Sequence, residues 1–208
     1  ALTELLVVSE DSRLDSDAFG LASYYDLLYS HAFGNYRDLL EGVTYHPAMG
    51  YYLSSINNEP TNEVENIHPD ENYAREVMQL FTIGLYELNQ DGTIIVDADD
   101  MPIETYDNSD IGEFARVFTG LGPDGYWAPW EDWSDEEVIW GVWYNTVPYI
   151  DATLQMEMFE DYHEGGVKHL LNGAATYEGA SGEEDIDMAL DNLFYHQNIA
   201  PFVSKHLI

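Results

Sequence analysis

Two histidines and two glutamates are the residues of this chain whose side chains could perform hydrolytic chemistry. They are His46, Glu71, Glu76 and His163. A neutral imidazole with one or two carboxylates can bind a divalent transition metal, and a further carboxylate can activate water. The spacing matches no established ligand motif, because the sequence has no HExxH and no two histidines four residues apart. The simpler interpretation of His46, which precedes Pro47, is a residue that caps the start of a helix.

Two acidic runs offer oxygen ligands of the kind that calcium accepts. They consist of Asp97, Asp99 and Asp100, and of Asp132, Asp135 and Glu136. Neither run has the EF-hand order of ligands with its central glycine and terminal glutamate. Such runs also arise by chance in a chain this acidic. Calcium is therefore one hypothesis for a cofactor, and solvated acidic loops are the alternative.

All five tryptophans lie in one acidic segment, which is the best candidate for a binding surface. They are Trp127, Trp130, Trp133, Trp140 and Trp143. Flat apolar rings among carboxylates can stack on sugar rings and hydrogen-bond their hydroxyls, or contact another protein chain. The same residues can also form a local core, buried against other parts of the same protein. The sequence leaves these alternatives open.

The charge balance is extreme. Forty acidic residues against six basic ones give a net charge of −34. Salt relieves the resulting self-repulsion, since the Debye length falls to about 3 Å at 1 M. We therefore expect a protein of a saline, halophilic or marine habitat, with a calcium-loaded surface or a cationic partner as alternatives. Nucleic acid and anionic membrane surfaces are disfavoured as partners, because few cations are present to contact phosphates.

The few cations that remain are expected where the fold needs them. Arg75 and Arg116 fall within the two clearest helical segments, beside apolar faces. A guanidinium there can pair with carboxylates such as Glu71, one turn before Arg75. We expect structural ion pairs at both arginines, and anchoring of an anionic substrate group is the alternative.

The apolar content of 45% and the length of 208 residues predict a folded chain rather than an acidic disordered tail. The absence of cysteine excludes disulfides, thiolate metal sites and cysteine nucleophiles. No apolar run approaches the roughly 20 residues that span a bilayer. The chain begins without Met and ends inside an apparently helical pattern, so we expect an internal fragment of a longer protein.

The apolar periodicity predicts a mainly α-helical, multi-helix single domain over 1–208, with an aromatic, acidic and partly β insertion over 122–160. Caps and breakers place the helices between them. The expected helices span about 15–30, 35–43, 46–53, 69–86, 108–118, 181–193 and 198–207, and short strands are expected at 93–96, 138–142 and 146–149. No internal repeat is evident.

Several strings resemble a known family. They lie at 31–40 (HAFGNYRDLL), 46–53 (HPAMGYYL), 70–85 (DENYAREVMQLFTIGL), 106–120, 162–168 and 198–207. In order and spacing the chain resembles the bacterial domain-of-unknown-function-1800 family. The resemblance implies a large, mostly helical, exported protein with further residues at both ends, located in the periplasm, at the cell surface or outside the cell. The family carries no agreed activity.

Two functional hypotheses follow. The first is a non-catalytic surface or periplasmic binding or assembly component, with Trp127–Trp143 as the contact surface for a glycan or another protein chain. The second is a metal-assisted hydrolase that uses His46, Glu71, Glu76 and His163. The enzyme hypothesis requires these four side chains to converge in one pocket, although they lie far apart in the sequence.

Overall fold

The computed structural model describes residues 1–9, 14, 17–124 and 151–208. These residues are mostly helical, so the expected mainly α class is confirmed. The helices are α1 (Leu2–Leu5), α2 (Ala18–Ser30), α3 (Tyr36–Thr44), α4 (Pro47–Tyr52), α5 (Asn72–Glu76), α6 (Asn108–Val117), α8 (Gly182–Phe194) and α9 (Ile199–Leu207). A π-helix (η2, Val77–Thr82) and two 3₁₀ turns (η4, Glu160–Tyr162; η5, Leu171–Gly173) add to them. Within these ranges, no helix is long and apolar enough to cross a membrane.

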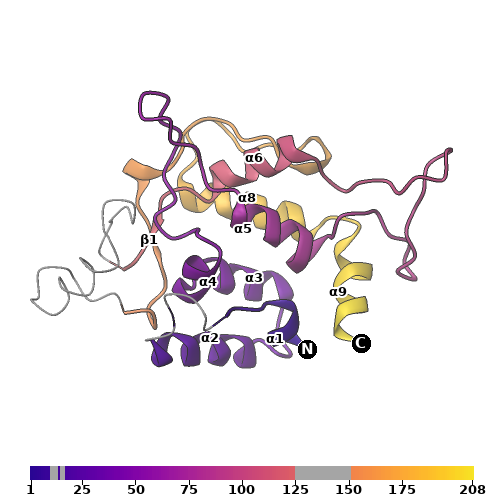
Figure 1. Ribbon diagram of the computed structural model, residues 1–208, viewed down its shortest axis with the longest axis horizontal. Coiled ribbons are helices and arrows are strands. Elements are labelled where there is room, and N and C mark those ends of the chain that lie inside the picture. Colours follow the sequence, from indigo (N-terminus) through magenta and orange to yellow (C-terminus); the bar gives the residue numbers. More distant parts are fainter. Residues whose placement is uncertain (10–13, 15–16, 125–150) are drawn as a thin grey trace, which may run out of the picture.

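The core lies where α3 and α8 meet. Helix α3 packs against α2, α4 and α8, and α8 also packs against α6, which covers α5 (Figure 1). The faces that meet are apolar and almost fully buried, which provides the main favourable term in folding. They include Leu39, Leu40, Val43, Phe114, Val117, Ile186, Leu190 and Leu193.

Local side-chain chemistry sets where these helices begin. The side chain of Asn35 accepts a hydrogen bond from the N–H of Arg37, and Ser181 and Glu184 form a reciprocal capping box at the start of α8. These two starts confirm the sequence prediction. Helix α2 begins later than expected, because the capping residue is Asp17, whose carboxylate accepts from the N–H of Gly20.

The predicted regular helix over 69–86 was wrong in its second half. After α5 the backbone widens into the π-helix, and the hydroxyl of Thr82 donates to the carbonyl oxygen of Val77, five residues earlier, at 2.6 Å. The helix then stops at Gly84, whose φ of +70° is costly for any residue with a side chain. The amide of Asn198 donates to the carbonyl oxygens of Ile83 and Tyr86, so this side chain does not cap α9 as predicted.

Residues 85–105 form an arm that extends from the helices (Figure 1). Three of its residues, spaced by eight, close a ring of backbone hydrogen bonds. Ile95 N–H donates to Glu87 at 2.8 Å, Ile103 N–H to Ile95 at 3.1 Å, and Glu87 N–H to Ile103 at 2.8 Å. Only the segment at 93–96 was expected to be extended. The eight-residue spacing was not recognised, because each segment is too short to show a period of its own.

The described ends of the predicted insertion meet in a small sheet. Strand β1 (Leu121–Gly122) pairs antiparallel with β2 (Glu157–Met158), with Leu121 opposite Met158. All five tryptophans and the second acidic run fall within 125–150, outside the described residues. The proposed contact segment and the calcium hypothesis for Asp132, Asp135 and Glu136 therefore stay predictions.

Candidate functional site

His46 is a buried cap. Its Nδ1 accepts a hydrogen bond from the N–H of Ala48 at 3.1 Å, so its Nε2 carries the proton and donates to Ser23 Oγ, 3.1 Å away. Burial lowers the pKa of His46 to about 4, which keeps the ring neutral at pH 7. A ring that donates to the serine hydroxyl cannot remove its proton. The contact therefore has the wrong tautomer for an activated serine nucleophile.

The two glutamates lie at opposite ends of α5, Glu71 just before its first residue and Glu76 at its last, and their surroundings differ. Glu71 accepts a hydrogen bond from Arg75 Nη2 at 2.8 Å, one helical turn away on the exposed surface. Burial raises the pKa of Glu76, and the charge of Arg75 partly offsets this effect. Among the described residues, Glu76 Oε2 is buried without a hydrogen-bond partner.

His163 belongs to a buried triad with Lys168 and Asp185. Its Nδ1 lies 2.9 Å from the carbonyl oxygen of Thr119, and its Nε2 lies 3.0 Å from both Lys168 Nζ and Asp185 Oδ2. Lys168 Nζ also contacts Asp185 Oδ2 directly. Burial alone would raise the pKa of Asp185, but the contacts of its carboxylate with His163 Nε2 and with the Lys168 ammonium outweigh this effect and lower that pKa.

None of the contacts described above joins two of the four candidate catalytic residues. Over the ranges that the structure describes, no group of three or more His, Asp or Glu side chains is placed to hold a metal ion. In the first acidic run, Asp97 Oδ1 accepts hydrogen bonds from the N–H groups of Asp99 and Met101, at 2.8 and 3.0 Å. That carboxylate closes its own turn.

Arg116 ties α6 to the segment that carries His163. Its Nε donates to Glu164 at 2.5 Å, and its Nη1 donates to Glu113 at 2.9 Å. Glu164 also accepts from the N–H and hydroxyl of Thr61, at 3.0 and 2.8 Å. Arg116, like Arg75, makes ion pairs with carboxylates of its own chain.

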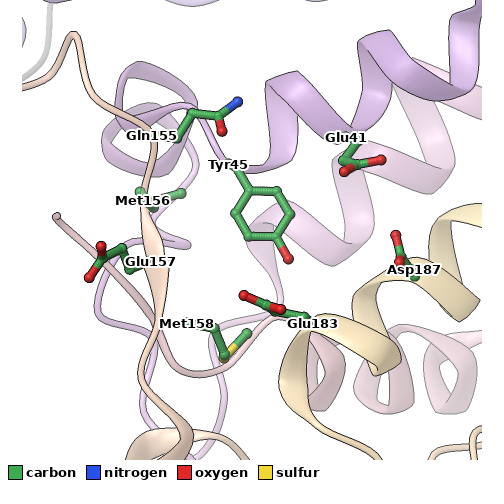
Figure 2. A pocket seen from close by; sticks show the side chains of 8 residues that line it. All are labelled: Glu41, Tyr45, Gln155, Met156, Glu157, Met158, Glu183 and Asp187. Carbon is green, nitrogen blue, oxygen red and sulfur yellow. The ribbon is translucent and has the colours of Figure 1, made fainter.

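Within the described residues, an open groove of about 460 Å³ has room for a ligand. Three segments far apart in the sequence form it: the end of α3, the first turns of α8 and the stretch 155–158 that includes β2 (Figure 2). The lining residues are Glu41, Tyr45, Gln155, Met156, Glu157, Met158, Glu183 and Asp187. Figure 2 shows the ring of Tyr45 between Gln155 and Glu183. In this view Glu41 and Asp187 lie to the right of the ring, opposite Met156 and Glu157.

One arginine neutralises part of this groove. The side chain of Arg37, 12% exposed, donates to Glu41 at 2.8 Å, to Asp187 at 2.8 Å and to Asp191 at 2.7 Å. These contacts join α3 to α8. Because four carboxylates line the groove and two of them share this guanidinium, the lining keeps a negative charge.

The electrostatics of the groove act on Tyr45. Burial raises the pKa of its phenol, and the charges of Glu183, Asp187 and Glu41 raise it further. The phenol therefore stays protonated and can serve as a hydrogen-bond donor, not as a nucleophile. Met156 is 3% exposed and packs in the core, so the apolar side of the groove is the partly buried side chain of Met158. The groove therefore fits a ligand that pairs a positive charge with an alkyl chain.

No pattern in the sequence pointed directly to this groove. Its helical members form two i, i+4 pairs, Glu41 with Tyr45 and Glu183 with Asp187, so each pair lies on one helix face. Only the packing of α3 on α8 brings the two pairs together. The 155–158 segment has no periodicity that would have assigned it to the same place.

Comparison with known proteins identifies an ancestry. The family model described as "Protein of unknown function (DUF1800)" matches residues 1–208, the whole chain. No curated protein and no solved structure matches it.

Proposed function

The chain belongs to the DUF1800 family, and we propose that it acts as an exported, salt-adapted binding or assembly component that uses the acidic groove to hold a basic segment of another protein. One observation carries this proposal. The groove is open and large enough for one or two side chains, and its lining combines four carboxylates, the phenol of Tyr45 and the partly buried thioether of Met158.

A lysine or arginine side chain fits this combination of groups. The charged head would pair with Glu183 and Glu157, while the alkyl stem would lie along the partly buried Met158. Arg37 already offsets Glu41 and Asp187, so those two carboxylates contribute less to the attraction. Electrostatic attraction of this kind speeds association and selects partners.

The position of the groove also supports an extended contact surface. Met158 and Glu157 belong to β2, and β1 and β2 pair at the described ends of the segment with the five tryptophans. We propose that the Trp127–Trp143 segment forms the second part of the same contact surface. A contact surface that combined aromatic residues with an acidic groove would suit a protein partner with basic and apolar side chains.

The test must separate the groove from the general acidity of the chain. A dye-labelled peptide with spaced lysines is titrated by fluorescence polarisation into three proteins at one fixed salt concentration: wild type, Glu157→Gln/Glu183→Gln, and Asp99→Asn/Glu104→Gln. The last pair removes the same charge from the arm, away from the groove. We expect the groove variant to bind about tenfold more weakly, since two exposed ion pairs of about 0.7 kcal/mol each sum to about 1.4 kcal/mol. The arm variant should stay within about twofold of wild type.

Equal loss of peptide affinity in both variants would show that binding depends on net charge alone, and it would overturn the proposal that the groove is the binding site. Tryptophan fluorescence provides a second readout, because all five tryptophans lie in the 127–143 segment. A spectral change on adding the peptide would support the two-part surface. A change with neutral polysaccharide and none with peptide would assign the segment to glycan instead.

A further inference from the structure

The triad of Lys168, Asp185 and His163 plays no part in peptide binding, and its burial is unusual. The three side chains are 1%, 1% and 3% exposed. Lysine and aspartate are almost never fully buried unless they are paired. Burying both ions carries a large desolvation penalty, which their attraction often fails to repay.

The fold holds the two charged groups face to face. Lys168 lies in a short backbone pairing, where its N–H donates to Thr176 Oγ1 at 3.1 Å and its carbonyl oxygen accepts from the N–H of Thr176 at 3.0 Å. Asp185 lies in the first turn of α8, which the capping box at Ser181 fixes. Lys168 Nζ contacts Asp185 Oδ2 and the two residues are 17 positions apart.

His163 touches both reacting atoms. Its Nε2 lies 3.0 Å from Lys168 Nζ and 3.0 Å from Asp185 Oδ2. Its Nδ1 faces the carbonyl oxygen of Thr119 at 2.9 Å, which fixes the Nδ1–H tautomer and leaves Nε2 to exchange a proton. In the described part of the chain, Asp185 Oδ1 accepts no hydrogen bond of regular geometry. The nearby hydroxyl of Thr176 nevertheless helps to lower the pKa of Asp185, which favours the ionised carboxylate.

We propose that Lys168 and Asp185 join through an intramolecular isopeptide bond between Nζ and Cγ, with His163 moving the protons. The inference is independent of the proposed binding function. His163 Nε2 first takes a proton from the Lys168 ammonium and passes it to Asp185 Oδ2. The neutral amine then attacks Cγ, and the new C–N bond forms.

The second half of the step releases water. The imidazole carries a second proton from Nζ to the same Oδ2, and the C–Oδ2 bond breaks with its electron pair on oxygen. One ammonium and one carboxylate become one amide and one water molecule, so atoms, protons and charge balance without any co-reactant. The product is favoured in this place because the neutral amide removes two buried charges, and the burial of all three side chains restricts the access of water that would reverse the reaction.

The experiment is a mass measurement on the purified, folded protein. After unfolding, cleavage on the carboxyl side of glutamate separates residues 165–178 from the peptide that begins at Asp185 in an uncrosslinked chain, because Glu164, Glu178 and Glu184 are cut. We expect these two peptides to appear joined, at their summed mass minus one water. Separate peptides of full mass, after prolonged incubation of the folded protein at neutral pH, would overturn the proposal.

Variants assign the roles. Lys168→Arg and Asp185→Ala should abolish the joined peptide, while Asp185→Asn should retain it by releasing ammonia in place of water. His163→Gln should slow its formation by about 100-fold, the lower end of the usual contribution of acid–base catalysis. The matched control is His169→Gln, an exposed histidine one position from Lys168, which should not change the rate. A His163→Gln protein that reacts as fast as wild type would remove the histidine from the mechanism.

Discussion

Replacement of Arg116 by methionine tests whether the few cations of this chain stabilise the fold. The side chain of Arg116 is 23% exposed and its partners Glu113 and Glu164 are 24% and 17% exposed. A hydrogen bond to a charged group contributes about 1.5–3 kcal/mol, and removing one partner of a buried pair costs about 3–5 kcal/mol. Because these groups are partly solvated and their effects are not additive, we expect Arg116→Met to lower the free energy of unfolding by about 2–3 kcal/mol.

The assay is urea unfolding at fixed high salt, followed by circular dichroism. Arg75→Met is the matched control, because its ion pair with Glu71 is 38% and 49% exposed and follows the ordinary i, i+4 geometry. That change should cost about 0.3–0.5 kcal/mol. Adding Glu164→Gln to Arg116→Met should recover part of the loss, since it removes the unpaired charge and keeps an oxygen for Thr61. Equal losses in the two single variants would refute the argument from burial.

Three further outcomes can be measured on the same protein. Gly84→Ala should lower the free energy of unfolding in urea by about 2–4 kcal/mol, because φ is +70° and the added Cβ would lie 2.5 Å from the ring of Phe202. Gly112→Ala is the control in α6, where an added Cβ would meet nothing within 4 Å, and it should raise the free energy of unfolding by about 0.5–1 kcal/mol. For His46, the folded pKa of about 4 lies below the usual 6.5, so the unfolded chain binds the proton first and stability falls as pH drops from 6.5 toward 4. Between pH 7.5 and pH 5 this loss of stability is about 2 kcal/mol. His46→Asn keeps a capping acceptor but has no group that titrates in this range, so the drop in its free energy of unfolding over the same interval should be smaller than that of wild type by about 2 kcal/mol. Finally, the net charge of −34 predicts that the urea midpoint of the wild type rises between 0.1 and 1 M NaCl, and an unchanged midpoint would contradict a salt-adapted surface.

The features that the sequence predicted are those decided within a few residues. Caps at Asn35, His46 and Ser181 depend on one side chain and an N–H two or three positions away, so composition and spacing are enough to find them. The apolar stripes of α3, α6 and α8 are of the same local kind. The mainly helical class followed from these stripes.

The candidate sites depend on contacts that no local pattern encodes. The groove needs α3, α8 and 155–158 to meet, and the triad joins residues 163, 168 and 185 at spacings that match neither a helix nor a strand. His163 was found as a candidate by its residue type, but its partners Lys168 and Asp185 were not. The π-helix was missed because a hydroxyl at Thr82 and a ring at Phe202, not an apolar period, decide how that helix ends.

The ring of hydrogen bonds in the arm has a consequence for how that region opens. Each of the three segments around Glu87, Ile95 and Ile103 donates to one neighbour and accepts from the other, so none is an end of the ring. Loss of any one segment leaves the other two as a short hairpin, which is marginal by itself. The amide protons of Glu87, Ile95 and Ile103 should therefore exchange with solvent at a common rate, and the arm should open as one cooperative unit while the helices stay closed.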